Sequence, residues 1–341
     1  MRKTGFFSGL AIILFAAFMI SLQGQSPARY DQGTEELHWY KGNTHTHTLN
    51  SDGDSFADEV VRWYREHGYN FLFITDHNFL TEVDVLNDLY GVEGRYLVIK
   101  GDEVSDNCDK KPIHLNALNP AYNVLPQGGE TVVETLQNNI DAIRAASGLV
   151  HINHPNFIWA ITAEDLKKVE NCVLLEIYNG HPAVNNLGGG GFPGVEQMWD
   201  DVLSSGKLMY GLGVDDAHVF RQPDNREAAR PGQAWVMVRA KELSVDAILK
   251  SLEQGDFYSS TGVELSDYET DADGIRINIK ERNNFKYRVL FIGKDGKVLK
   301  EEISNPAIYR FFGDEKYVRA KILDSNGNVA WTQPVMIRSG S

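Results

Sequence analysis

The sequence is poor in residues on which several classes of protein depend. Its 341 residues include only two cysteines, Cys108 and Cys172, which cannot build a disulfide scaffold. One bridge between them and two free thiols both remain open. Basic residues are also few, because 33 lysines and arginines face 47 aspartates and glutamates, for a net charge of −14. This balance disfavours a protein that clamps a nucleic-acid backbone.

Repeats and low-complexity linkers are absent as well. The chain is 42% hydrophobic and 23% charged, which is ordinary for a globular protein and excludes a disordered, collagen-like or multi-span membrane protein. The length is about that of two domains.

Long hydrophobic runs are missing except near the N-terminus. There Arg2 and Lys3 precede an uninterrupted apolar run over residues 10–20, and small or polar residues follow it. This layout is typical of a secretory signal peptide, and the run is short for a membrane span, which needs about 20 apolar residues. We predict a signal peptide over residues 1–26 and a secreted or periplasmic protein without stable membrane insertion; an uncleaved anchor is the alternative.

Strand-like apolar runs alternate with helical stretches over the next part of the chain. Seven such runs cover residues 39–46, 70–75, 96–101, 113–118, 149–153, 173–178 and 208–214. Helical spacing appears between several of them, as in the stripe formed by Phe56, Val60, Val61 and Tyr64. The alternation predicts an α/β fold with a parallel sheet and crossover helices, and seven strands favour closure into a barrel.

The pattern changes beyond about Gly262. Strand-like runs follow one another without a helical stripe, and Asp295-Gly296 and Asn326-Gly327 are typical hairpin turns. No histidine occurs there. We therefore predict a barrel over residues 35–262 and a small all-β, sandwich-like domain over residues 263–341, which is not expected to carry metal chemistry.

Histidines and carboxylates gather near the ends of the predicted strands. His45 and His47 close the first strand two residues apart, so that both imidazoles point to one side. Later strands contribute Asp76, His77, Asp102, Glu103, His114, His151, His154, Asp215, Asp216 and His218.

Six strands that each deliver such residues predict a shared site, because the C-terminal strand ends of a parallel barrel lie on one face. A mixed set of imidazoles and carboxylates suits zinc, manganese or iron rather than calcium. More than four ligands imply more than one ion.

The order of these motifs resembles the PHP (polymerase and histidinol phosphatase) superfamily of metal-dependent phosphoesterases. The similarity runs from about Lys41 to His218 and includes the motifs His-x-His, Thr-Asp-His, His-x-Asn-Ala-Leu, Asn-His-Pro, Glu-Ile-Tyr-Asn and Asp-Ala-His. The resemblance implies a distorted seven-stranded, TIM-like β/α barrel that holds two or three divalent metal ions.

The resemblance also implies which residues hold the ions. The first ion would be bound by His45, His47, Glu103 and Asp216, the second by a bridging Glu103 with His114 and His154, and the third by Asp52, His77 and His218. Asp52 departs from the family pattern, since several relatives have histidine there. Asp215 is an alternative to Asp216, although the spacing to His218 favours Asp216.

The implied chemistry is hydrolysis by a metal-activated hydroxide, in which no protein nucleophile is needed and Glu103 and Asp216 act through the ions. His181, after the sixth strand, is a candidate proton donor to the leaving alkoxide, unless it is a loop histidine without a role. Glu176 could support a ligand imidazole. Basic residues in loops after ligand-bearing strands could contact the substrate phosphate or be solvated surface charges; the main ones are Lys110, Arg221 and Arg230.

We therefore expect a secreted, metal-dependent hydrolase of a small phosphorylated substrate, with no nucleic-acid partner. One alternative is hydrolysis of a non-phosphate ester, lactone or amide on the same barrel. Another is a secreted binding protein that retains the metal site. DNA proofreading, known for PHP domains attached to polymerases, is disfavoured by the N-terminal segment, the acidic charge and the lack of a polymerase domain.

Overall fold

The structure is a computed structural model, and it describes residues 36–222 and 224–337. The predicted signal peptide, residues 1–26, lies outside the described residues. No helix in the described part is long and apolar enough to cross a membrane.

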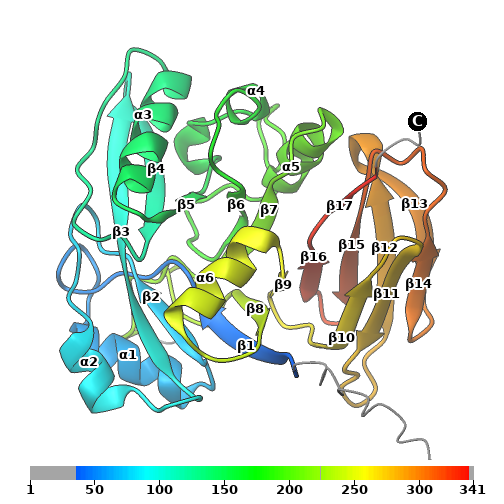
Figure 1. Ribbon diagram of the computed structural model, residues 1–341, viewed down its shortest axis with the longest axis horizontal. Coiled ribbons are helices and arrows are strands. Elements are labelled where there is room, and N and C mark those ends of the chain that lie inside the picture. Colours follow the sequence, from blue (N-terminus) through cyan, green and yellow to red (C-terminus); the bar gives the residue numbers. More distant parts are fainter. Residues whose placement is uncertain (1–35, 223, 338–341) are drawn as a thin grey trace, which may run out of the picture. The chain divides into compact units, whose positions relative to one another are not determined.

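The first part of the described chain alternates strands and helices (Figure 1). Its strands are β1 (His38–Asn43), β2 (Phe71–Ile74), β3 (Leu97–Cys108), β4 (Lys111–Leu118), β5 (Leu149–Ile152), β6 (Leu174–Asn179), β7 (Tyr210–Val214), β8 (Trp235–Ala240) and β9 (Phe257–Ser260). Its helices are α1 (Ala57–Glu66), α2 (Asp84–Tyr90), α3 (Val132–Ala145), the one-turn 3₁₀ helix η1 (Phe157–Trp159), α4 (Ala163–Leu166), α5 (Val195–Ser204) and α6 (Val245–Gln254).

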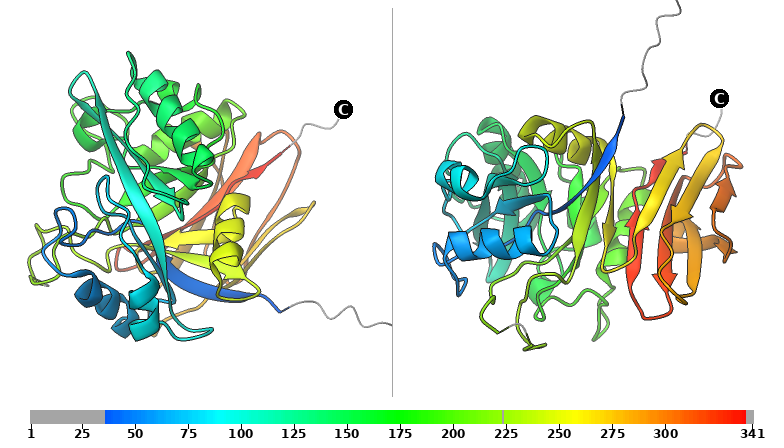
Figure 2. Two further views of the ribbon diagram at one scale, coloured as in Figure 1. Left: turned by 60° about the vertical axis from the view of Figure 1, so that its left-hand side comes forward. Right: turned by 90° about the horizontal axis from the view of Figure 1, so that it is seen from below.

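The C-terminal part is almost entirely β-structure, and the right-hand view of Figure 2 shows its orange and red strands as one group beside the helical part. These strands are β10 (Leu265–Thr270), β11 (Gly274–Ile279), β12 (Tyr287–Gly293), β13 (Lys297–Glu302), β14 (Ala307–Arg310), β15 (Tyr317–Asp324), β16 (Val329–Thr332) and β17 (Val335–Met336), with the 3₁₀ turn η2 (Lys294–Gly296).

One sheet of 14 strands runs through both parts in the order β13-β12-β15-β16-β9-β8-β1-β2-β3-β4-β5-β6-β7, with β17 paired to β15. The pairs β1–β2, β2–β3, β5–β6 and β6–β7 are parallel. Strands β10, β11 and β14 form a separate antiparallel sheet. The predicted α/β architecture with a following antiparallel β part is confirmed.

The direction of β4 corrects the prediction of an all-parallel barrel sheet. This strand is antiparallel to both β3 and β5. The reason is the connection, since only Asp109 and Lys110 separate β3 from β4, and both have positive φ angles of 49° and 66°. A two-residue turn of this kind forms a hairpin.

The seven-stranded barrel stays a prediction, because β1–β7 belong to the larger sheet. Beyond the strand ends, however, the segment after β7 returns to the segment after β1. A parallel bridge joins Thr46 to Ala217, and the His47 N–H donates to the Ala217 carbonyl at 2.9 Å. This bridge brings the predicted ligands of the two segments together.

Helix α1 shows how the sequence pattern packs against the sheet. Val60, Val61 and Tyr64 are buried as their spacing predicts. Phe56 is 61% exposed, which corrects its place in the predicted stripe, because it is the N-cap and precedes the helix.

The two parts of the chain share buried contacts. Strand β16 pairs with β9, and Tyr317 and Trp331 belong to the same buried cluster as Trp199 of α5. The predicted boundary at residue 262 stays a prediction.

Candidate metal centre

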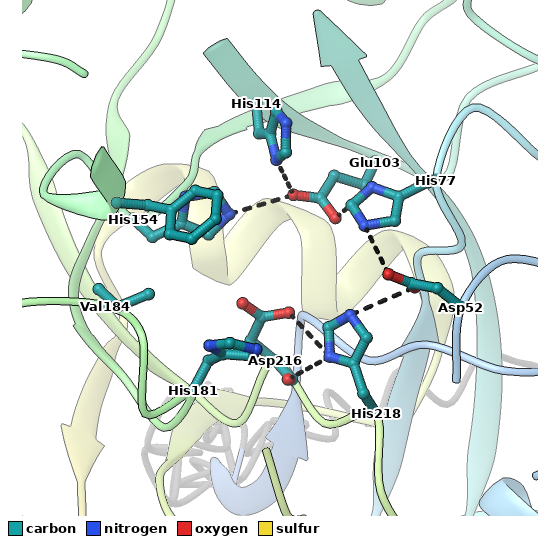
Figure 3. Close-up of a pocket in the computed structure, with 10 residues that line it drawn as sticks. Asp52, His77, Glu103, His114, His154, His181, Val184, Asp216 and His218 are labelled. Carbon is teal, nitrogen blue, oxygen red and sulfur yellow. Dashed lines mark hydrogen bonds and ion pairs between the residues drawn. The ribbon is translucent and has the colours of Figure 1, made fainter. Parts of the chain in front are cut away.

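The nine predicted ligands lie together: most of them follow β1, β2, β5 or β7 along the chain, and Glu103 and His114 lie within β3 and β4. Figure 3 shows those that line the cavity over the cluster. Four overlapping groups bring their nitrogen and oxygen atoms within 4.8 Å of one another: His45, His47 and Glu103; His45, His154 and Asp216; His77, Glu103 and His114; and His47, Asp52, His77 and His218. Sequence positions that span more than 170 residues thus meet at one site.

The centre of the cluster consists of two imidazoles and two carboxylates. His45 Nε2 lies 3.2 Å from both Glu103 Oε2 and Asp216 Oδ1. His47 Nε2 lies 3.2 Å from Glu103 Oε2 and 3.1 Å from Asp216 Oδ1. The two Nε2 atoms are 3.1 Å apart. Zinc–nitrogen bonds of about 2.0–2.1 Å in a tetrahedral site place neighbouring ligand atoms about 3.3 Å apart, so the two nitrogens have the spacing of ligands to each other and to both carboxylate oxygens.

The hydrogen bonds also favour a cation. His45 Nδ1 lies 2.6 Å from Glu176 Oε1, so this nitrogen carries a proton, and Nε2 is the atom that faces the cluster. Glu103 Oε2 is buried and has no well-aligned hydrogen bond, although nitrogens of His45, His47 and His77 lie within 3.2 Å. A bound cation would satisfy this oxygen and the lone pairs that face it.

Glu103 is the most connected group. Its other oxygen, Oε1, lies 3.0 Å from His114 Nδ1 and 3.2 Å from His154 Nε2, and accepts a hydrogen bond from Asn153 Nδ2 at 2.8 Å. Burial opposes its ionisation, yet the imidazoles of His45, His77 and His114 hold the pKa of this carboxyl well below its usual range. Each oxygen faces its own set of imidazoles, as a bridging carboxylate requires.

The third predicted group is the most open. The Asp52 side chain is 56% exposed and lies 3.3 Å from His218 Nε2 and 3.6 Å from His77 Nε2. His77 Nδ1 also lies 3.0 Å from Glu103 Oε2. His77 therefore stands between the second and third groups, and which ion it would hold stays a prediction.

The two neighbouring aspartates after β7 have different surroundings. The Asp215 carboxylate accepts hydrogen bonds from the backbone N–H groups of Gly232, Gln233 and Ala234 and from the Tyr64 hydroxyl, at 2.6–2.9 Å. It anchors the loop before β8. Asp216 faces His45 and His47 instead.

Glu176 lies behind the cluster. Besides His45, its Oε1 lies 3.2 Å from His151 Nε2, and its Oε2 accepts from the His154 N–H at 2.7 Å and from Asn179 Nδ2 at 2.9 Å. The carboxylate fixes both the ring of His45 and the backbone of His154.

A cavity of about 120 Å³ opens over the cluster and is lined by Asp52, His77, Glu103, His114, His154, Phe157, His181, Val184, Asp216 and His218. His181 Nδ1 accepts from the Ala183 N–H at 3.1 Å, so a neutral His181 holds its proton on Nε2.

The predicted phosphate-contacting residues do not line this cavity. Lys110 is exposed in the β3–β4 turn. Arg221 Nη2 donates to Glu59 Oε2 at 3.2 Å, and Arg230 Nη2 donates to Gln233 Oε1 at 3.4 Å. Their contact with a phosphate stays a prediction.

Three polar residues at the site were not singled out from the sequence. Asn153 and Asn179 each donate to a ligand carboxylate, of Glu103 at 2.8 Å and of Asp216 at 3.0 Å. The Ser105 hydroxyl lies 2.5 Å from His77 Nδ1. The two asparagines belong to the Asn-His-Pro and Glu-Ile-Tyr-Asn motifs, which was the only sign of them in the sequence.

Comparison with known proteins supports a common fold. No family model matches the sequence. An uncharacterised protein of Methanocaldococcus jannaschii is 31% identical over 154 residues, which are 41% of this chain and 70% of the archaeal protein. A two-domain protein of Bacteroides vulgatus that contains a predicted PHP-like metal-dependent phosphoesterase has a similar structure, with a TM-score of 0.52 and 15% identity over 88% of this chain and 96% of that chain.

The chain shares the fold of this Bacteroides vulgatus protein. An amidohydrolase of Chromobacterium violaceum is a weaker structural match, with a TM-score of 0.38 and 13% identity over 53% of this chain and 88% of that protein. The shared fold with the Bacteroides vulgatus protein agrees with the resemblance seen in the motifs.

Proposed function

We propose that this protein is a metal-dependent hydrolase of the PHP superfamily that cleaves phosphoester bonds. The observation that carries the proposal is Glu103, whose buried carboxylate faces five imidazoles, three at one oxygen and two at the other. Sites that hold two ions about 3.5–4 Å apart are typical of phosphatases and nucleases. The phosphoesterase contained in the structurally similar Bacteroides vulgatus protein supports the same substrate class.

The chain would hold two or three ions of zinc, manganese or iron. His45, His47, Glu103 and Asp216 would bind the first, Glu103, His114 and His154 the second, and Asp52, His77 and His218 the third. When bound, such ions lower the pKa of water and neutralise the charge of a phosphoryl group. Glu176 keeps the proton of His45 on Nδ1, so that the lone pair of Nε2 would be available to bind an ion.

His181 is the group of the chain that we propose to deliver a proton. Its Nδ1 is occupied by the Ala183 N–H, and its ring lines the cavity over the cluster (Figure 3). The Nε2 proton would pass to the leaving alkoxide as the phosphorus–oxygen bond breaks. The ten residues around the cavity include no lysine or arginine, so the ions would supply most of the positive charge that a phosphate needs.

The experiment is a hydrolysis screen with protein reconstituted separately with Zn²⁺, Mn²⁺ and Fe²⁺. A panel of phosphate monoesters and diesters is assayed beside carboxylic esters, lactones and amides. We expect turnover of phosphoesters only. Turnover confined to the other esters or amides would favour the alternative hydrolase, and metal binding without any turnover would favour a binding protein.

We further propose that the protein is exported, with residues 1–26 as a signal peptide. The charged start and the apolar run of residues 10–20 support this proposal. Sequencing of the native N-terminus should begin near residues 25–29. Intact Met1 on soluble cytoplasmic protein would contradict export.

A further inference from the structure

A second and larger cavity adjoins the metal centre. It measures about 600 Å³, against about 120 Å³ for the cavity over the ligands. His181 and Val184 line both cavities, so the two cavities lie next to each other at these residues.

The walls of this groove come from both parts of the chain. The end of β6 and the loop after it, from Ile177 to Gly188, form one wall. Strands β15 and β16 form the other through Lys321, Val329 and Trp331. The rings of Tyr178 and Trp331 meet across the groove with centroids 5.8 Å apart.

The charged groups of the groove are already paired. Lys321 Nζ donates to Glu196 Oε2 at 2.6 Å, and Glu196 Oε1 accepts from Arg319 Nη2 at 3.0 Å. Among the residues that line the groove, Lys321 and Glu196 therefore leave no unpaired charge for a ligand to bind.

The rest of the lining combines apolar or aromatic side chains, such as Leu187 and Trp331, with uncharged polar ones, such as Asn185 and Thr261. Leu187 lines the rim and is 95% exposed. Burial of such a side chain against a ligand would remove apolar surface from water, at about 25 cal/mol per Å². The groove thus suits an uncharged group with an apolar face.

The volumes of the two cavities indicate that each would hold a different part of a substrate. Sites for small organic ligands usually measure about 300–1,000 Å³. The cavity over the metal ligands is smaller than this range and suits a phosphoryl group, whereas the groove falls within it. If the phosphate of a substrate lay at the metal ligands, its alcohol part would extend past His181, which lines both cavities, into the groove.

We propose that the groove binds the alcohol part of the substrate and selects an uncharged, ring-bearing alcohol of about the size of a sugar or a nucleoside. This assignment rests on the proposed phosphoesterase function. It gives the C-terminal part a direct place in substrate binding, through Trp331 and Val329.

The experiment compares esters of primary alcohols, so that the leaving groups are chemically alike. Ethyl phosphate is the small reference, glucose 6-phosphate and uridine 5′-monophosphate are the ring-bearing substrates, and phosphoglycolate, whose alcohol carries a carboxylate, is the charged one. We expect kcat/KM for at least one ring-bearing ester to exceed that for ethyl phosphate by about tenfold or more, and phosphoglycolate to be the poorest substrate. The two ring-bearing esters distinguish a sugar from a nucleoside.

Two variants test whether the groove causes the preference for ring-bearing esters. Leu187→Ser alters an exposed side chain and leaves the core intact, and Tyr178→Leu removes one aromatic face while it keeps an apolar side chain against the core. Each should lower kcat/KM for the preferred ring-bearing ester by about tenfold, mainly through KM, because the loss of an apolar contact in a pocket costs a factor of about 10–200. Activity on ethyl phosphate should not change. Ile303→Ser, at a side chain that is 82% exposed and does not line the groove, is the matched control.

The outcomes separate the two proposals. If no phosphoester is hydrolysed, including ethyl phosphate, the proposed function is wrong and the substrate assignment falls with it. If ethyl phosphate is hydrolysed with the same kcat/KM as the ring-bearing esters, and both groove variants behave like Ile303→Ser, the proposed function stands and the groove assignment is wrong.

Discussion

The side chain of Gln333 is hydrogen-bonded to the backbone of Gly211 at both ends of its amide. The Gly211 N–H donates to Gln333 Oε1 at 2.7 Å, and Gln333 Nε2 donates to the Gly211 carbonyl at 3.0 Å. Gly211 lies in β7, at the end of the strand order, five residues before Asp216. Ser259 adds a second brace, because its hydroxyl accepts from the Gly213 N–H and donates to the Gly211 carbonyl, both at 2.8 Å. Side chains thus satisfy backbone groups along the outer edge of the strand that leads to a metal ligand.

Replacement of Gln333 by alanine should therefore loosen β7 and weaken metal binding. The variant leaves the Gly211 N–H and carbonyl with fewer partners, which costs about 1–3 kcal/mol for a buried polar group. We expect the free energy of unfolding in urea to fall by about that amount and zinc retention after dialysis to decrease. Gln254→Ala, at an exposed residue of α6, is the control. Unchanged stability and metal content in Gln333→Ala would show that β7 needs no brace from the C-terminal part.

This brace marks the limit of what the sequence could predict. The clustering of the candidate ligands was predictable because most of them follow a strand-like run within a short motif, as His45 and His47 do. Gly211 and Gln333 are 122 positions apart and are joined through the side-chain amide of one glutamine. No local sequence pattern predicts this contact. Hydrogen bonding of β7 to Gln333 of the C-terminal part was therefore not predicted from the sequence.

The direction of β4 was unpredictable for a different reason. Two-residue hairpins usually carry glycine or asparagine where φ is positive. Here Asp109 and Lys110 adopt such angles without either residue, so the turn left no recognisable sign. Lys110 does follow a ligand-bearing strand, as predicted, but it lies in the turn of a hairpin.

Glu103→Gln should remove the bridge between metal ions. The substitution keeps the size of the side chain but replaces one acceptor oxygen by an amide nitrogen that only donates. Metal content should fall by at least one ion per chain, and hydrolysis by several orders of magnitude. Elemental analysis and phosphatase assays measure both, with Lys100→Gln on the same strand as the control. Full metal occupancy with near-normal activity would contradict the proposed ligand set.

Glu176→Gln should weaken metal binding without removing a ligand. An amide cannot hold the His45 Nδ1 proton and the His154 N–H as a carboxylate does. Loss of such an outer hydrogen bond typically lowers metal affinity by about 10–100-fold. Titration with a competing chelator measures this affinity. An affinity equal to that of the wild type would show that the orientation of His45 does not depend on Glu176.

Lys41 should make stability depend on pH in the alkaline range. Burial lowers its pKa from 10.5 to about 8, against the opposing attraction of Asp215. Between these values the unfolded chain binds the proton that the folded chain has lost, so the free energy of unfolding should rise with pH from about 8 to 10.5. Lys41→Met removes this group, and the difference between the two urea-unfolding profiles isolates it. A difference that does not change over this range would contradict the lowered pKa.

Asp200 and Arg319 should hold the two parts of the chain together. Arg319 Nε and Nη2 donate to the two carboxylate oxygens of Asp200 at 2.8 and 2.7 Å, and the Tyr317 hydroxyl adds a third bond at 2.7 Å. Arg319 is fully buried and Asp200 nearly so. The pair joins α5 to β15, beside the proposed groove.

Asp200→Asn leaves the guanidinium buried without its full countercharge, which costs about 3–5 kcal/mol when one partner of a buried pair is lost. We expect the free energy of unfolding to fall by an amount of this order. The exposed pair Arg144–Glu253, with nitrogen and oxygen 3.0 Å apart, is the matched control, and Glu253→Gln should cost less than about 1 kcal/mol. The double variant Asp200→Leu with Arg319→Met removes both charges and should recover much of the loss, because an apolar pair needs no compensation. If Asp200→Asn and Glu253→Gln were equally stable, the buried pair would not be what joins the two parts.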